Sequence, residues 1–124
     1  MGALVVHFEL PEPEEEWPAD EEEALRRAFH LWVALVFAES QMRVPVRTGR
    51  LLASSRVEGE EDWREIIYNC EYAEECEDGR GKPGEKYFFE GRHYVGGAIE
   101  DNLDRFDDLY KRSLAQDFSV TESI

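Results

Sequence analysis

Hydrophobic and polar residues follow two different periods along the chain, and these periods predict both strands and helices. Ala3–Leu10 is apolar and β-branched enough to form a short strand. Apolar residues recur at helical spacing from Asp20 to Gln41 and again from Tyr94 to Gln116. Between the two helices, Leu51–Glu58 and Arg64–Glu71 predict a β-hairpin closed by a polar, glycine-containing loop. The order strand, helix, strand, strand, helix predicts an α+β domain, with a small antiparallel sheet packed against a long central helix and a C-terminal helix.

The first predicted helix is apolar on more than one face. Its main stripe is Leu25, Ala28, Phe29, Trp32, Leu35 and Val36, and other faces carry Leu31, Val33, Ala34 and Phe37. A helix at the surface of a small domain would be polar on those other faces. Two explanations stay open: the sheet and a second helix cover this helix on two sides, or a neighbouring subunit buries one face. Asp20 is the expected N-cap, with Glu23 in the reciprocal position, and Pro45 ends the helix.

Three further segments are predicted to lie outside these elements. Pro11–Glu23 contains eight acidic residues and three prolines, which predict an extended, solvated connector. Asp78–Gly91 contains four glycines and a proline and is a predicted long loop that carries three consecutive aromatic residues. The residues 1–116 are expected to form one domain, and 117–124 a C-terminal tail. In the last helix the predicted buried stripe is Val95, Ile99, Leu103, Phe106, Tyr110 and Leu114.

Composition narrows the class of protein. The 124 residues are 42% hydrophobic, which is enough for a core and argues against a wholly disordered chain. The net charge of −15 argues against general binding to nucleic acids or to anionic lipids. The longest apolar stretch, Ala28–Ala38, is shorter than the roughly 20 residues of a membrane span. Met1–Leu10 lacks the pattern of a signal peptide, so we expect a soluble, intracellular domain in a reducing compartment.

No pattern for metal binding, cofactor binding or covalent catalysis is evident. The possible zinc ligands have no zinc-site spacing and are Cys70, Cys76, His7, His30 and His93. Cys70 is expected to be a small buried hydrophobic residue. Ser54 and Ser55 are not part of a nucleophile elbow, and the glycines of the long loop do not complete a dinucleotide fingerprint. We therefore expect no enzymatic activity, no metal site and no cofactor.

One segment departs from the acidic background. From Ser40 to Val57 there is no acidic residue, and the segment carries Arg43, Arg47, Arg50 and Arg56. Two explanations stay open here as well. Either the arginines cluster by chance or pair locally with the acidic hairpin, or they form a positive surface that fits an acidic surface of a neighbour, such as a second copy of the chain.

The same segment resembles a known family. Residues 44–55, VPVRTGRLLASS, resemble the "aPvdTGrLrrS" segment of tailed-phage neck and tail-completion proteins, of the type found in long-tailed phages. A second match, from Tyr68 through Tyr72-Ala73 and Glu75 to Gly79, looks like the family's "Y-A-x-x-v-E-x-G" strand end. A third is the glycine-rich loop followed by aromatic residues and a last helix. The resemblance covers residues 24–116.

The resemblance implies a virion protein that performs no reaction. Such a protein forms a ring, six- or twelve-fold, in the neck, between the head connector and the tail-tube or tail-terminator proteins. Packaged DNA passes nearby without specific binding, no membrane is involved, and the chain is made in the host cytoplasm. The expected subunit-interface residues are Arg43, Arg47, Thr48, Gly49, Arg50, Arg56, Tyr72, Tyr87, Phe88 and Phe89.

A function of a different class also fits the charge. An acidic DNA mimic that inhibits a host nucleic-acid enzyme would need carboxylates at regular spacing on one continuous face. Here the acidic residues fall in at least four clusters separated by apolar elements. The net charge could equally reflect a salt-adapted host.

Overall fold

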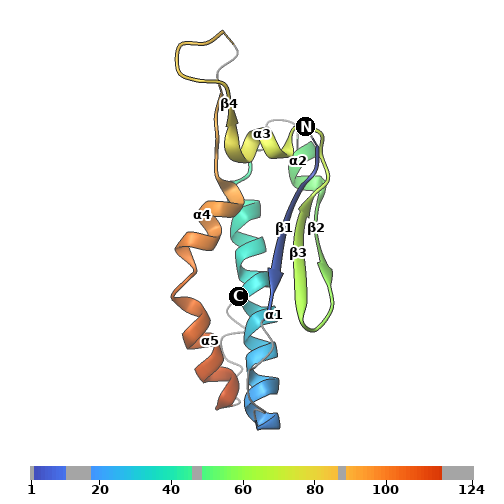
Figure 1. Cartoon of the computed structure of the whole chain (residues 1–124), viewed down its shortest axis with the longest axis vertical. Helices are drawn as coiled ribbons and strands as arrows, with labels where there is room; N and C mark the ends of the chain where they lie inside the picture. The colour runs from blue at the N-terminus through green and yellow to red at the C-terminus, as the bar shows by residue number, and fades with distance from the viewer. Residues whose placement is uncertain (1, 11–17, 46–48, 87–88, 116–124) are drawn as a thin grey trace.

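The computed structural model describes residues 2–10, 18–45, 49–86 and 89–115. A three-stranded sheet, a long central helix and a pair of shorter helices form three layers, and a narrow hairpin projects from one end (Figure 1). This arrangement confirms the predicted α+β class. In chain order the elements are β1 (Leu4–Glu9), α1 (Ala19–Arg43), α2 (Arg50–Ala53), β2 (Ser55–Gly59), β3 (Trp63–Tyr68), α3 (Ala73–Asp78), β4 (Gly79–Arg80), β5 (Phe89–Glu90), α4 (Tyr94–Asp101) and α5 (Arg105–Leu114).

The sheet has the strand order β1-β3-β2, and both pairs of neighbours are antiparallel. Val6, Ile66 and Val57 lie opposite one another in the register, and all three belong to the hydrophobic core or pack against it. The next row, His7, Glu65 and Glu58, lies on the other face because side chains alternate along a strand. The predicted strand and hairpin are therefore present, with shorter strands than the sequence pattern suggests.

The central helix α1 is covered on two sides. Trp32 makes edge-to-face contacts with Phe8 of β1 at 5.5 Å and with Phe106 of α5 at 6.2 Å between ring centroids. Its indole Nε1 donates a hydrogen bond of 2.7 Å to the carbonyl oxygen of Asn102. Val33 and other α1 residues are buried in the same core. The first explanation for the apolar faces of this helix, cover by sheet and helices, is therefore observed.

The start of α1 differs from the prediction. Asp20 is not the N-cap, because the cap position falls on Pro18 and has no side-chain hydrogen bond. Proline there is compatible with a helix start, and its carbonyl oxygen accepts hydrogen bonds from the backbone N–H groups of Glu21 and Glu22. Asp20 and these two glutamates occupy the first turn, where the helix dipole favours negative charge. Of the acidic connector, residues 11–17 lie outside the described residues, as does the predicted tail, 117–124.

The predicted strand Leu51–Glu58 is wrong in its first half. Arg50–Ala53 forms the short helix α2, and the strand begins only at Ser55. Gly49 precedes α2 with φ +73°, a left-handed conformation that glycine adopts at little cost. The segment 72–79, expected to be a strand end, is also helical, since α3 occupies Ala73–Asp78. Both helices are only one or two turns long, which is too short for a helical pattern of apolar residues to be recognised in the sequence.

The last helix is broken into two. Asn102 ends α4, is fully buried, and donates its side-chain amide to Glu39 and to the carbonyl oxygen of Ala98, both at 2.7 Å. The break changes the helical register. Leu103, which we predicted to be buried, is therefore 61% exposed, whereas Leu109 is buried. Leu114, also predicted to be buried, is exposed at 40%.

The burial of Tyr94 leads to a prediction of how the stability of the fold changes at alkaline pH. Tyr94 is fully buried, donates a hydrogen bond of 2.8 Å to the carbonyl oxygen of Ala73, and packs edge-to-face on Tyr68. Burial raises the pKa of both tyrosines above the ordinary value. Above about pH 10 the unfolded chain therefore loses these protons before the folded chain does, and stability falls as pH rises.

We expect Tyr94→Phe to make this alkaline loss shallower, at a cost of about 1 kcal/mol at neutral pH for the lost hydrogen bond. Urea unfolding between pH 7 and pH 11 measures both quantities. The control is Tyr110→Phe, because the Tyr110 ring is only partly buried. An unchanged alkaline slope in Tyr94→Phe would contradict this account.

Candidate functional site

Among the described residues, the predicted interface residues Arg43, Gly49, Arg50 and Tyr72 lie at or beside the ends of α1, α2 and α3. Arg56 lies in β2. Arg47, Thr48, Tyr87 and Phe88 lie outside the described residues. Phe89 begins β5, but its side chain is not among those described.

Arg43 is held within the chain. Its guanidinium forms a hydrogen-bonded ion pair with Asp101 of α4 and lies 3.7 Å from Glu39, one helical turn back. The guanidinium rests on the backbone of α4 at Gly97, where a Cβ atom would come 2.5 Å from Nη1. Arg43 therefore fastens the end of α1 to α4, which the sequence pattern did not indicate.

The other two described arginines also have acidic partners in the chain. Arg50 lies 3.3 Å from Glu71 and over the ring of Tyr72, with 5.7 Å between guanidinium carbon and ring centroid. Arg56 pairs with Glu58 of the acidic hairpin at 2.8 Å. Pairing with the acidic hairpin, the first explanation for the arginine segment, is therefore observed for Arg56, whereas Arg43 and Arg50 pair with acidic residues elsewhere in the chain. The pairs of Arg50 and Arg56 are exposed, and exposed ion pairs contribute at most about 1 kcal/mol, so a neighbour's carboxylate could replace their partners. A contact with a neighbour remains a prediction.

The predicted glycine-rich loop has strands at its base. Gly79 pairs with Glu90 and Arg80 with Phe89, so residues 79–90 form a hairpin that we name the arm. Figure 1 shows the arm projecting beyond the three layers. Its described tip, residues 81–86, is exposed throughout and includes Lys82 and Lys86. The arm carries Arg80, Lys82 and Lys86 against Glu85 and Glu90, so its net charge is +1 on an acidic chain.

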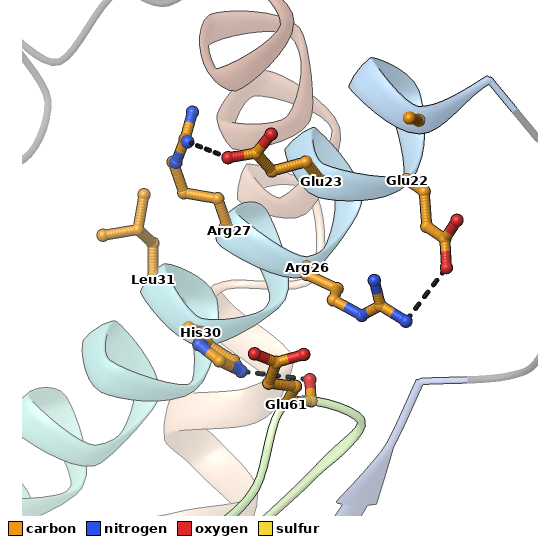
Figure 2. A pocket seen from close by; sticks show the side chains of 8 residues that line it. Glu22, Glu23, Arg26, Arg27, His30, Leu31 and Glu61 are labelled. Atoms are coloured by element: carbon orange, nitrogen blue, oxygen red, sulfur yellow. Dashed lines mark hydrogen bonds and ion pairs between the residues drawn. The ribbon is translucent and has the colours of Figure 1, made fainter.

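A hollow of about 620 Å³ lies beside the first turns of α1 (Figure 2). Figure 2 shows Arg26 directed toward Glu22 and Arg27 toward Glu23, and these pairs measure 2.9 and 3.1 Å. His30 Nε2 lies 3.0 Å from the carbonyl oxygen of Glu61. The remaining lining residues are Ala19 and Leu31. Positive and negative side chains alternate here in solvated pairs, and the lining offers no serine or cysteine nucleophile beside His30.

A second cluster lies at the base of the arm, where α3 ends and α4 begins. Glu77 is only 7% exposed, and its two carboxylate oxygens accept hydrogen bonds from the backbone N–H groups of Val95 at 2.8 Å and Gly96 at 3.0 Å. A Cβ atom at position 96 would come 3.0 Å from one of these oxygens, which favours glycine. Glu77 therefore caps α4 from another helix.

Asp78 and His93 lie beside this cap. One ligand atom from each of Glu77, Asp78 and His93 lies within 4.8 Å of the others. His93 precedes α4 in a left-handed conformation, with φ 49° and ψ 43°. This cluster is not recognisable from the sequence, because the arm separates its two halves along the chain. Only pairing across the arm, which short spacing motifs do not encode, brings them together.

The two cysteines are free thiols. Cys70 is buried, as predicted, although it follows β3 and is not within it. Cys76 is partly exposed, and burial raises the pKa of its thiol above the ordinary value. A raised pKa keeps the thiol protonated at neutral pH, which makes Cys76 a poor nucleophile.

Across residues 2–10, 18–45, 49–86 and 89–115, no helix has both the length and the apolar character that crossing a membrane requires. Comparison with known proteins gives no match: no protein-family model, no curated protein and no solved structure is significantly similar to this chain.

Proposed function

We propose that the chain is a structural subunit of an oligomeric ring in the neck of a tailed virus, between the head connector and the tail tube. The observation that carries the proposal is the place of the segment resembling the family. Residues 44–55 join the end of the long helix α1 to strand β2 through α2. In the family the corresponding segment also follows a long helix and leads into a strand.

Two exposed features support a role in assembly. A closed ring requires two different surfaces on each subunit that fit one another. The arm is one such surface. The other is the outward face of α1, where Ala34, Ala38 and Met42 follow at helical spacing and are exposed, Met42 at 83%. Methionine side chains adapt to partners of different shape, and the small alanines beside Met42 allow a partner to approach the helix closely.

The charge of the chain is compatible with DNA passing through such a ring. A net charge of −15 repels phosphate, so DNA could move past the subunit without being held. The alternative, a DNA mimic, is less well supported. Several carboxylates are paired within their own helix, as Asp107 is with Lys111 and Asp108 with Arg112, and do not form an uninterrupted acidic face.

The experiment is assembly in the presence of the neighbouring neck proteins, because such subunits can require a template. Native mass spectrometry and particle imaging should detect rings of six or twelve copies. We expect Arg50→Glu to reduce ring formation by about tenfold or more, since a reversed charge repels an acidic neighbour. Because the Arg50 side chain is exposed, we expect the variant to fold like the parent chain, and circular dichroism checks this.

The matched control is Lys111→Glu, another reversal at an exposed ion pair, on α5. Equal loss of rings in both variants would remove Arg50 from the interface. A chain that stays monomeric with every neighbouring neck protein and is absent from virions would contradict the proposed function. The position of the gene, between genes for a head connector and a tail tube, would support it.

A further inference from the structure

Three side chains with metal-binding groups meet at the base of the arm, and we propose that they bind one Zn²⁺ ion. Glu77 and Asp78 contribute carboxylates from the end of α3, and His93 contributes an imidazole from the start of α4. This inference is independent of the proposed assembly function. It concerns how the arm is fixed to the body of the protein.

The backbone holds the two halves of the cluster together before any ion binds. The N–H of His93 donates to the carbonyl oxygen of Glu77 at 3.0 Å, and the N–H of Arg92 donates to that of Cys76 at 2.8 Å. Gly91 permits this approach, because a Cβ atom there would come 2.5 Å from the Glu77 carbonyl oxygen. Preformed ligand positions reduce the entropy lost when an ion is bound.

The three side chains are differently engaged. The Glu77 carboxylate is buried and fixed by its two backbone donors, whereas Asp78 and His93 are exposed. Neither of these two side chains forms a hydrogen bond or ion pair with another described residue. The imidazole and the Asp78 carboxylate therefore give up no internal bond when they bind an ion.

The spacing suits one ion between the ligands. All three ligand atoms lie within 4.8 Å of one another. In a tetrahedral zinc site, ligand atoms at about 2.1 Å from the ion lie about 3.4 Å from one another, so an inward movement of the exposed Asp78 and His93 side chains completes the site. Each oxygen of a carboxylate has two lone pairs, so Glu77 can bind the ion while it continues to cap α4.

The donor set indicates the class of ion. One imidazole nitrogen and two carboxylate oxygens fit Zn²⁺, with water as a fourth ligand, better than they fit the all-oxygen sites of Ca²⁺ or Mg²⁺. The two carboxylates balance the charge of a divalent ion, and three further acidic residues nearby in the sequence, Glu71, Glu74 and Glu75, add to the attraction. A bound ion would tie α3 to α4 and stabilise the base of the arm.

The test is to titrate the metal-free full chain with ZnCl₂ and to measure binding by isothermal titration calorimetry and stability by thermal unfolding. We expect one Zn²⁺ per chain and a rise in Tm of about 5 °C when free Zn²⁺ is at tenfold excess over the measured Kd. MgCl₂ should give no rise. His93→Asn should weaken binding about tenfold or more, and asparagine suits the left-handed backbone at this position. Asp78→Asn should weaken binding as well.

Two control variants separate this site from the other zinc ligands of the chain. His7→Asn removes a different surface histidine, one that lies 2.9 Å from Glu65, and should leave the affinity unchanged. Cys76→Ser removes the partly exposed thiol and should also leave it unchanged. The proposal is overturned if no binding is detected up to 1 mM ZnCl₂, a limit of about 4 kcal/mol in affinity. It is also overturned if the affinity for Zn²⁺ falls in His7→Asn or in Cys76→Ser. A Zn²⁺ affinity that is unchanged in both His93→Asn and Asp78→Asn would overturn it as well.

Discussion

Replacing Trp32 with alanine is expected to lower the free energy of unfolding by about 3–5 kcal/mol, as removal of large buried aromatic side chains does. Trp32 is 8% exposed and lies between the sheet and the C-terminal helices, where it contacts Phe8 and Phe106. Its indole N–H also satisfies the carbonyl oxygen of Asn102 at the break between α4 and α5. The substitution therefore leaves a cavity at the point where all three layers meet.

Urea unfolding at pH 7 measures this effect. Trp32→Phe keeps a ring but removes the N–H donor, so we expect an intermediate loss of about 1–2 kcal/mol. The matched control is Trp63→Ala, because Trp63 is only partly buried and stacks on His7 at a centroid distance of 5.7 Å. If Trp32→Ala cost no more than Trp63→Ala, the central position assigned to Trp32 would be wrong.

Replacing Glu77 with glutamine is expected to lower the free energy of unfolding by about 2–3 kcal/mol. The carboxylate accepts two backbone hydrogen bonds at the start of α4, and bonds to a charged group are stronger than neutral ones. The amide has only one acceptor oxygen and no charge to oppose the positive end of the helix dipole. One buried N–H group would then face an N–H₂ group.

The measurement is urea unfolding in EDTA, so that bound metal does not contribute. Glu74→Gln is the control, since Glu74 lies in the same short helix but is exposed. We expect the control to change the free energy of unfolding by less than about 0.5 kcal/mol. Equal effects of the two substitutions would show that Glu77 does not act as a cap.

Helices and strands whose hydrophobic pattern extends over many residues were predictable from the sequence. Short elements that depend on local turns were not. Helix α1 and strands β1 and β3 were found, because their apolar residues repeat over six residues or more, whereas the five-residue strand β2 was found only in part. The break at Asn102 was missed. Apolar spacing continues across it, and only the buried hydrogen bonds of the Asn102 amide and carbonyl explain why the helix stops there. The helices α2 and α3 were missed because they are four and six residues long.

The candidate sites divide in the same way. The arginine segment was visible as a local change of charge, but sequence could not say that Arg43 reaches Asp101, 58 residues away. The cluster of Glu77, Asp78 and His93 could not be recognised, because it depends on pairing across the arm. The sequence shows residue types and short spacings, but it does not show which distant residues tertiary packing brings into contact.

The strand order of the sheet has a consequence for the growing chain. Strand β3 is paired with β2 through a short turn, but its other neighbour is the first strand, and His7 and Glu65 are 58 residues apart. The entropy of closing a long loop delays such a pairing relative to a local one. During synthesis β1 emerges first and then waits, with its hydrogen-bonding groups unpaired, until β3 has been made. Of the three strands of this sheet, we therefore expect the one translated first to pair last.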